Sequence, residues 1–297
     1  MATYCLWETP SAELVESSVL HLEYRSIPWV ICLPSSVGCS MGCQICAISR
    51  TPRPKSLSHS ELLAILRYSL SIAGSPDQFQ ATFMGQGEPL CQRESVFAFC
   101  SLVCRDFPTA TIGISTVGVS NGIRALTEEF WANRVKLQLS VHACPSDKRR
   151  MIIPAEKEFP IAEAIHAAAV FSRRRATRCC INYVLLDHVN DSEDDAELLA
   201  SMASSRYFYV KLAAFNTFPG CVYSASSPDR VAAFGKVLQL RGIETHVFQS
   251  VGTMVGAGCG QTRLVTRKIS PPIHARVCTG HSTGEKTTTT MTCGGQL

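Results

Sequence analysis

The strongest constraint on the fold of this chain is a regular alternation of short apolar segments with amphipathic ones. Apolar runs of roughly four to eight residues are typical of strands, and an apolar repeat of about 3.6 residues is typical of helices. One helical segment begins at Ser58, where Glu61 three residues later predicts a capping box, and Leu62, Leu66 and Leu70 follow one face. Repeated strand–helix units of this kind predict an α/β fold with a parallel sheet and helices outside it.

The predicted elements cover most of the chain. Strands are expected at residues 29–33, 81–84, 111–116, 135–141, 181–186, 208–215 and 244–249. Helices are expected at residues 58–73, 97–104, 121–130, 161–171, 191–203 and 230–240, with Asp191 as the cap of the fifth. We divide the chain into an N-terminal extension (1–28), a core (29–267) and a Thr- and Gly-rich tail (268–297) that we expect to be disordered. Polar residues follow the strands directly, and in a β/α barrel such positions share one face.

Composition excludes several classes of protein. The 46% hydrophobic and 18% charged residues of the 297-residue chain argue against a disordered protein. The N-terminus has no signal-peptide pattern, and no apolar run approaches the ~20 residues of a membrane helix. We therefore interpret the 15 cysteines as reduced thiols of a cytoplasmic protein rather than as disulfides. The net charge of +4 permits contact with a phosphate backbone but does not require it.

Three cysteines form the most informative motif. The segment GCSMGCQIC places Cys39, Cys43 and Cys46 in a loop directly after the first predicted strand of the core. Three thiolates from one loop can hold three irons of a 4Fe–4S cluster, which leaves the fourth iron free to bind S-adenosylmethionine (SAM). A structural zinc site is the alternative, but zinc normally takes four ligands, and the chain offers no second cysteine or histidine pair at suitable spacing. A chance grouping is a further alternative in a chain so rich in cysteine.

Further motifs extend this pattern along the chain. In order, they are CLPSSVGCSMGCQIC, FMGQGEPL, ISTVGV, LSVHA, YVLLDHVND, FNTFPG and GAGCGQ. From about Glu16 to Thr262, the chain resembles the radical SAM methyltransferases that modify carbon 2 of an adenine in ribosomal RNA and some transfer RNAs. It also resembles the related resistance enzymes that methylate adenine carbon 8. The resemblance implies a partial (β/α)6 radical SAM barrel, a 4Fe–4S cluster and SAM as cofactors, and a flavodoxin or ferredoxin as electron donor.

The resemblance also implies which residues bind SAM. Gly87 and Glu88 match the turn that meets the methionine amino group, and a carboxylate is a suitable acceptor for an ammonium group. The other matching positions are Ser115, Ser140, Val141, His142 and Asn216. Each has an ordinary structural explanation as well, since Ser115 could cap a helix and His142 could be a satisfied histidine at a strand end.

Two more cysteines match positions with chemical roles in the family. By the resemblance, Cys259 receives a methyl group from one SAM, and a radical from a second SAM takes a hydrogen atom from that S-methyl group. The methylene radical adds to the ring carbon, and Cys32 then helps to remove the ring proton and forms a disulfide with Cys259. Two buried thiols without chemistry are the alternative. Glu16 resembles the family's acidic residue upstream of Cys32 and is assigned proton handling, with a solvated glutamate as the alternative.

The chain departs from the family in three places. The family usually has a helical RNA-gripping domain before the core, and we expect none here, because few residues precede Cys32. Acidic residues common before Cys259 are missing, and Ile45 replaces the usual aromatic residue. RNA is the expected substrate, and basic residues near the site, Lys148, Arg149 and Arg150 among them, are candidates for phosphate contacts. Solvated charges at helix ends are the alternative, which we prefer for the arginine-rich run 173–178. The alternatives are a radical SAM methylase of a small molecule or peptide, and a non-catalytic RNA- or zinc-binding protein.

Overall fold

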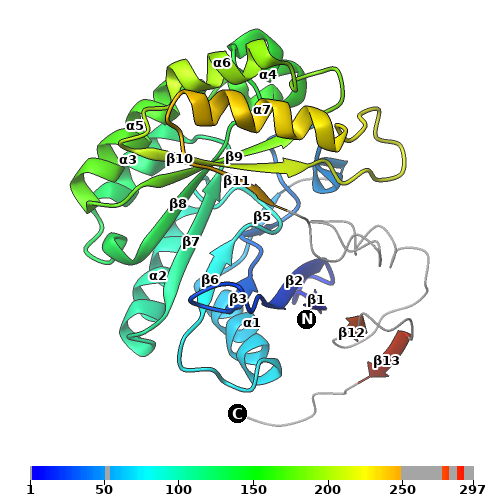
Figure 1. The fold of residues 1–297 in the computed structure, drawn as a ribbon. Coiled ribbons are helices and arrows are strands. Elements are labelled where there is room, and N and C mark those ends of the chain that lie inside the picture. The colour runs from blue at the N-terminus through cyan, green and yellow to red at the C-terminus, as the bar shows by residue number, and fades with distance from the viewer. Residues whose placement is uncertain (1, 51–53, 249–275, 281–285, 291–297) are drawn as a thin grey trace. The chain divides into compact units, whose positions relative to one another are not determined.

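The computed structural model describes residues 2–50, 54–248, 276–280 and 286–290 (Figure 1). The chain divides into two compact units. Unit 1 comprises Met1–Ser40, Arg50–Gly113 and Val251–Leu297, and unit 2 comprises Met41–Ser49 and Ile114–Ser250.

Unit 1 is built on a mixed set of strands with two helices. Strand β3 (Trp29–Cys32) pairs in parallel with β6 (Gln80–Phe83), as expected from the sequence. On its other side, β3 pairs antiparallel with β2 (Leu14–His21), β2 pairs with β1 (Ala2–Glu8), and the order continues to β12 (Arg276–Gly280) and β13 (Lys286–Thr290). The remaining elements are the helices α1 (His59–Ile72) and α2 (Arg93–Asp106) and the short pair β4 (Ser36–Val37) and β5 (Lys55–Ser56).

Strands β1 and β2 lie in the N-terminal extension, where the sequence predicted no element. The central residues of β2 are buried, and they include the polar Glu16, Ser17 and Ser18. This hides the apolar alternation by which a strand is recognised. Partners inside the unit stabilise these polar groups; for example, Trp7 Nε1 donates to Ser17 Oγ at 2.9 Å.

Unit 2 is built on a parallel sheet. The strands run in the order β7 (Thr111–Thr116), β8 (Val135–Ser140), β9 (Cys179–Leu185), β10 (Phe208–Ala214) and β11 (Thr245–Phe248), with β7 beginning in unit 1. The pairs β8–β9, β9–β10 and β10–β11 are parallel. Its helices are α3 (Ser120–Glu128), α4 (Ser146–Ile152), α5 (Ile161–Arg175), α6 (Glu193–Met202) and α7 (Pro228–Leu240), with 3-10 turns at Ala47–Arg50, Ala132–Arg134 and Pro154–Lys157. The predicted α/β fold is confirmed.

Helices cover one face of these strands. Along β10, Phe208, Val210 and Leu212 are fully buried, whereas the alternate residues Tyr209 and Lys211 are half-buried. Helix α5 packs on β8 and β9, and α7 packs on β10 and β11. A strand with one face against helices shows this period of two, which explains why pattern analysis located these strands well.

Three details differ from the sequence prediction. Helix α2 begins at Arg93, four residues before the predicted start, and α4 was not predicted at all. Ser192, not Asp191, caps α6: its hydroxyl accepts from the Asp195 N–H, and Asp195 reaches back to form a capping box. Asp191 is instead ion-paired to Arg230 at 2.5 Å, a long-range contact that the sequence does not reveal.

Strands β12 and β13 lie inside segment 268–297, for which we expected no regular structure, and the rest of that segment lies outside the described residues. Among the residues that the structure describes, no helix is long and apolar enough to span a membrane.

Candidate functional site

A tight turn after β6 holds the first of the predicted SAM-binding residues. Gly87 has φ +94°, and a Cβ atom there would lie 2.3 Å from the hydroxyl oxygens of both Ser35 and Ser36. The Gln86 carbonyl accepts from the Ser35 N–H at 2.7 Å, which holds the turn against this segment. Only glycine fits a position that combines a left-handed backbone with such a close approach. Glu88 is 4% exposed, and its Oε1 accepts from the Leu90 N–H at 3.1 Å.

Cys32 ends β3 in a half-buried position directly opposite Ser18 of β2. Burial raises the pKa of its thiol to about 11, and the negative charge of Glu16 raises it further. Hydrogen bonds from the Met84 backbone and the Ser18 side chain act in the opposite direction but are outweighed. Cys32 is therefore a neutral thiol at physiological pH, in contrast to an activated cysteine.

Glu16 lies on β2 two residues before Ser18, which pairs with Cys32, and it is only 7% exposed. The interpretation of Glu16 as a solvated surface residue is therefore wrong. Its backbone N–H donates to Gln86 Oε1 at 3.1 Å. The structure thus brings Glu16, Cys32 and the Gly87–Glu88 turn together within unit 1.

Gln86 makes this link and was not identified from the sequence. Its side chain is 1% exposed, and its Nε2 group has no hydrogen-bond partner among the described residues. A glutamine between two glycines of a turn gives no periodic signal, so its contact with a strand 70 residues away appears only in three dimensions.

The end of β8 holds three further predicted residues of unit 2. Ser140 is half-buried, Val141 is buried, and His142 is 8% exposed with φ +59°. The Val184 N–H donates to His142 Nδ1 at 3.0 Å, and Asn190 Nδ2 donates to the His142 carbonyl at 2.5 Å. Burial, with a smaller contribution from the Arg149 charge, lowers the pKa of His142 to about 3. The imidazole is therefore neutral, and because Nδ1 accepts a hydrogen bond, the ring proton is on Nε2.

Arg149 is the clearest correction to the sequence analysis. It is not a surface residue that meets phosphates, because it is 0% exposed. Its guanidinium donates to the carbonyls of Val117 at 2.6 Å, Ser140 at 2.9 Å and Val141 at 2.8 Å, and it forms an ion pair with Glu156. The neighbouring Arg150 is exposed, and sequence alone gives no signal that separates these two arginines.

The other predicted residues of unit 2 follow their strands as expected. Ser115 is half-buried at the second-to-last position of β7, and Asn216 is half-buried two residues after β10. Because β7, β8, β9 and β10 are consecutive in the sheet, Ser115, Ser140 and Asn216 lie at the carboxyl edge of neighbouring strands.

The predicted cluster cysteines are all half-buried. Cys39 belongs to unit 1, and Cys43 and Cys46 belong to unit 2. In unit 2, the Cys46 N–H donates to the Cys43 carbonyl at 3.2 Å, and the Gln44 N–H donates to the Ile152 carbonyl at 2.8 Å. Within the described residues, no three His, Cys, Asp or Glu side chains are gathered closely enough to ligate one metal ion. A set of three accessible thiols on one short loop nevertheless fits the chemistry of an iron–sulfur cluster, in which each thiolate binds a different iron. Cys259 lies outside the described residues.

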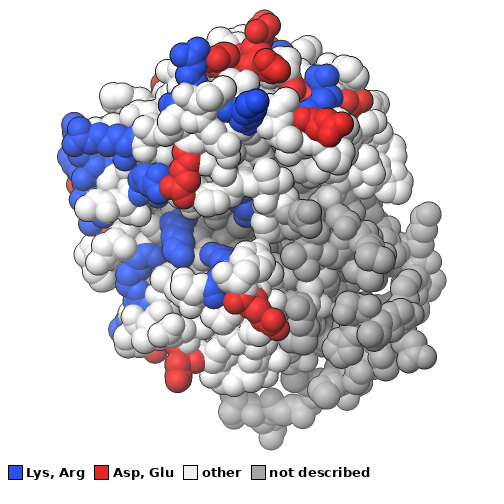
Figure 2. All heavy atoms as spheres, viewed as in Figure 1, with Lys and Arg blue, Asp and Glu red and all other residues white. Residues whose placement is uncertain are grey.

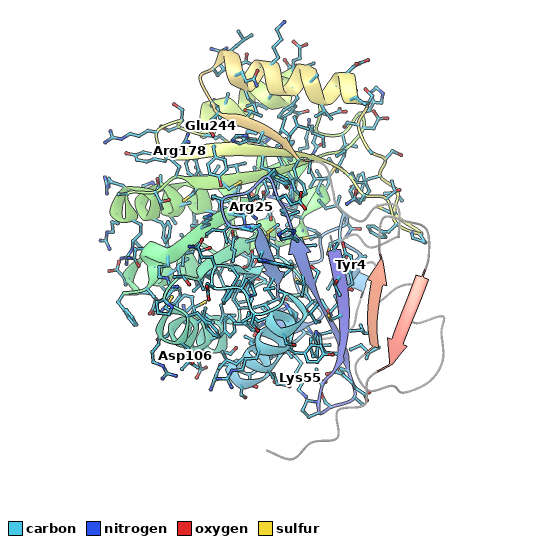
Figure 3. The ribbon with its side chains drawn as sticks, turned by 60° about the horizontal axis from the view of Figure 1, so that its bottom comes forward. Tyr4, Arg25, Lys55, Asp106, Arg178 and Glu244 are labelled. Atoms are coloured by element: carbon cyan, nitrogen blue, oxygen red, sulfur yellow. The ribbon has the colours of Figure 1, made fainter. Side chains whose placement is uncertain are left out.

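Several basic side chains away from these strand ends have acidic partners. Figure 2 shows Lys and Arg side chains interspersed with acidic ones on the visible face. In the run 173–178, Arg174 pairs with Glu128, and Arg178 pairs with Glu244, which is labelled with it in Figure 3. Near the cluster loop, Lys55 is exposed and donates to Ser11 Oγ at 2.7 Å. The run 173–178 is therefore best explained as helix-end charges with local partners.

Comparison with known proteins identifies related sequences and folds. Residues 33–199, more than half of the chain, match the radical SAM superfamily. The chain is 33% identical, over 85% of its length and 74% of the relative's, to a probable dual-specificity RNA methyltransferase RlmN 1 of Opitutus terrae. It is 31% identical, over 91% of its length and 78% of the relative's, to the probable RlmN of Thermotoga neapolitana. A crystal structure of a radical SAM methyltransferase from Sphaerobacter thermophilus is 28% identical and matches with a TM-score of 0.81 over 88% of this chain and 76% of that one.

Proposed function

Because the chain belongs to the radical SAM superfamily and, within it, to the family of the RlmN methyltransferases, we propose that it methylates a ring carbon of adenine in an RNA. The similarity to proteins named as RNA methyltransferases, over 85% or more of this chain, is the observation that supports an RNA substrate. The superfamily uses a 4Fe–4S cluster and SAM, so the chain is a methyltransferase with these two cofactors.

We assign the cluster to Cys39, Cys43 and Cys46. SAM is assigned to the carboxyl ends of the strands, with Glu88 as the acceptor for its amino group and the Gly87 backbone close against it. The other assigned positions are Ser115, Ser140, Val141, His142 and Asn216. The neutral His142, whose Nε2 carries the ring proton, is suited to donate one hydrogen bond and unsuited to act as a base. When bound, the cluster supplies the electron that cleaves SAM to a radical able to take a hydrogen atom.

The chain's own residues supply the covalent part of the proposed mechanism. Cys259 attacks the methyl group of a first SAM and holds it as a thioether. After hydrogen abstraction by the radical from a second SAM, the methylene carbon on Cys259 bonds to the adenine carbon. The adduct then loses the ring proton and one electron, and this electron would return to the cluster. The Cys32 thiolate attacks the sulfur of Cys259, the bond between that sulfur and the methylene carbon breaks, and the carbon takes up a proton as the disulfide forms and the methylated base leaves. Two electrons from an external reductant then restore both thiols.

The surroundings of Cys32 support a role for Glu16 in this sequence. A thiol with a pKa of about 11 needs a base before it can act as a nucleophile at neutral pH. The buried Glu16, two residues from Ser18 on β2, is the carboxylate that we assign to accept that proton. A flavodoxin or ferredoxin is the proposed electron donor, as in the family that the chain resembles.

The test is a Cys259→Ala variant of the full chain, loaded with its cluster and given RNA and SAM under reducing, anaerobic conditions. Mass spectrometry of the digested RNA is expected to show methyladenosine with the native chain and none with the variant. Cys104→Ala, at a half-buried cysteine of α2 outside the proposed site, is the matched control and should methylate normally. Methylation by the Cys259→Ala variant would contradict the covalent mechanism. A cell lacking the gene with an unchanged set of methylated adenosines would instead favour a small molecule or peptide as substrate.

A further inference from the structure

Arg149 has no role in the chemistry proposed above, yet it is a fully buried arginine of unit 2. Taking a guanidinium ion out of water is expensive unless each donor finds a partner. Burial lowers the pKa of Arg149, and the carboxylate of Glu156 opposes that shift. Such a group requires a physical explanation.

The contacts of Arg149 converge on two strand ends. Its Nε donates to the Val141 carbonyl, and one Nη donates to both the Ser140 carbonyl at the end of β8 and the Val117 carbonyl just after β7. The planar fork of an arginine can make these bonds in several directions at once, whereas a lysine ammonium is a point charge. One side chain thereby fixes the distance between the ends of β7 and β8.

The second anchor of Arg149 is Glu156. This carboxylate is 2% exposed and also accepts from the Ile161 N–H, at 3.2 Å through Oε1 and at 3.1 Å through Oε2, where α5 begins. The guanidinium is therefore fixed on both sides, with the strand ends on one and the start of a helix on the other. An arginine held in this way is rigid, and rigidity is what a positioning group needs.

Two carbonyls that Arg149 binds belong to Ser140 and Val141, which are themselves assigned to SAM. We propose that Arg149 is a positioning residue for SAM: it clamps the ends of β7 and β8 so that Ser115, Ser140, Val141 and His142 face the ligand in a fixed arrangement. This inference rests on the proposed assignment of SAM to these strand ends, but not on RNA as the substrate. The helix that carries Arg149 also contacts the cluster loop, since the Gln44 N–H donates to the Ile152 carbonyl of α4 at 2.8 Å.

The test measures SAM binding, not methylation. The full chain is loaded with its cluster anaerobically, and the Kd for SAM is obtained by titration calorimetry. Arg149→Lys keeps the charge but not the fork, and about tenfold weaker binding is expected, equivalent to roughly 1.4 kcal/mol. The SAM-dependent change in the electron paramagnetic resonance spectrum of the reduced cluster should need correspondingly more SAM. Arg150→Lys, at the exposed neighbour, is the matched control and should bind SAM as the native chain does.

A second pair of variants separates positioning from stability. Glu156→Gln leaves the carbonyl contacts available but loosens the anchor, so severalfold weaker SAM binding is expected. Leu238→Ala removes a fully buried side chain of α7 away from the clamp and should lower stability without changing the Kd of the folded protein.

If Arg149→Lys and Glu156→Gln are folded and bind SAM with native affinity, Arg149 has only a structural role and the proposal is wrong. Should Arg149→Lys fail to fold, the Glu156→Gln result decides the question alone. None of these measurements uses RNA, so failure of the RNA proposal leaves their interpretation unchanged. Conversely, native SAM affinity in these variants would contradict the role of Arg149 but not the proposal that the chain methylates RNA.

Discussion

The ends of two strands, β3 in unit 1 and β8 in unit 2, hold ionisable groups in different protonation states and with different partners. The end of β3 in unit 1 presents a half-buried thiol, Cys32, beside a buried carboxylate, Glu16. The end of β8 in unit 2 presents backbone groups that a buried guanidinium, Arg149, holds in place. The first has a neutral group whose protonation can change, and the second has a charged group whose partners are already satisfied.

Cys32 is therefore suited to a chemical step, and Arg149 is suited to holding other groups in position. A raised thiol pKa costs nothing at neutral pH, because the protonated form is the one that burial favours. A buried cation is stable only while its partners remain, so its removal leaves Glu156 uncompensated. Variants at the β3 end should therefore alter thiol reactivity with little effect on stability, and variants at the β8 end should lower stability and weaken SAM binding.

The largest effect on stability is expected at the β8 end. Arg149→Met should lower the free energy of unfolding by about 3–5 kcal/mol, because Glu156 is left as an unpaired buried charge. Cys32→Ser, a change of one atom in a half-buried side chain, should cost about 1 kcal/mol or less. Urea denaturation of both variants, monitored by circular dichroism, measures the two values. Equal losses would remove the distinction between the two regions.

The turn beside Cys32 offers the next test. Gly87→Ala should lower stability by at least ~2 kcal/mol more than Gly74→Ala and should abolish SAM binding. Both glycines have positive φ, but a Cβ atom at Gly74 meets nothing within 4 Å, whereas one at Gly87 meets two hydroxyls at 2.3 Å. The pair of variants thus isolates the close approach from the backbone strain. Similar losses in both would show that crowding at Gly87 is relieved by a small shift.

Alkaline pH should distinguish the thiols of the two regions. Burial, the largest cause in both, raises the pKa of Cys144 to about 12 and that of Cys32 to about 11 from a usual value of 9.0. Because the folded state keeps its proton where the unfolded state loses it, stability is fully present below pH 9 and falls as the pH rises toward 11 or 12. The slope is roughly 1.4 kcal/mol per pH unit for each of the two thiols between its unfolded and folded pKa values. Unfolding measurements between pH 8 and 12 should show that Cys32→Ala reduces this slope only up to about pH 11, whereas Cys144→Ala reduces it up to about pH 12.

The smallest effect concerns the reactivity of Cys32. Glu16→Gln removes a negative charge that raises the pKa of Cys32, so the thiolate fraction at pH 9 should increase. Alkylation of Cys32 by iodoacetamide, followed by peptide mass spectrometry, should become severalfold faster. Ser18→Ala removes a stabilising hydrogen bond and should slow the same reaction. A Glu16→Gln variant that reacts more slowly would show that the carboxylate does not act on Cys32 through its charge.

Much of the fold was predictable because its information is local. The helix-covered strands of unit 2 alternate buried and half-buried residues, and α1 begins at the predicted capping box of Ser58 and Glu61. Strand β2 was not predicted from the sequence because Glu16, Ser17 and Ser18 are polar residues that are nevertheless buried. The sequence placed the cap of α6 one residue too early because Asp191 and Ser192 are both good caps, and only the distant Arg230 decides between them.

The sequence by itself determined the alternation of strands and helices, the family and the residue types at each strand end. Periodicity, glycine spacing and motif order are all properties of neighbouring residues, so they can be recognised without a structure. Only the tertiary structure decided the environment of each side chain. It made Cys32 a neutral thiol beside Glu16, placed Gln86 between them and the Gly87 turn, and distinguished the buried Arg149 from the exposed Arg150. Burial and charge pairing depend on groups far apart in the chain, and these set pKa values and rigidity.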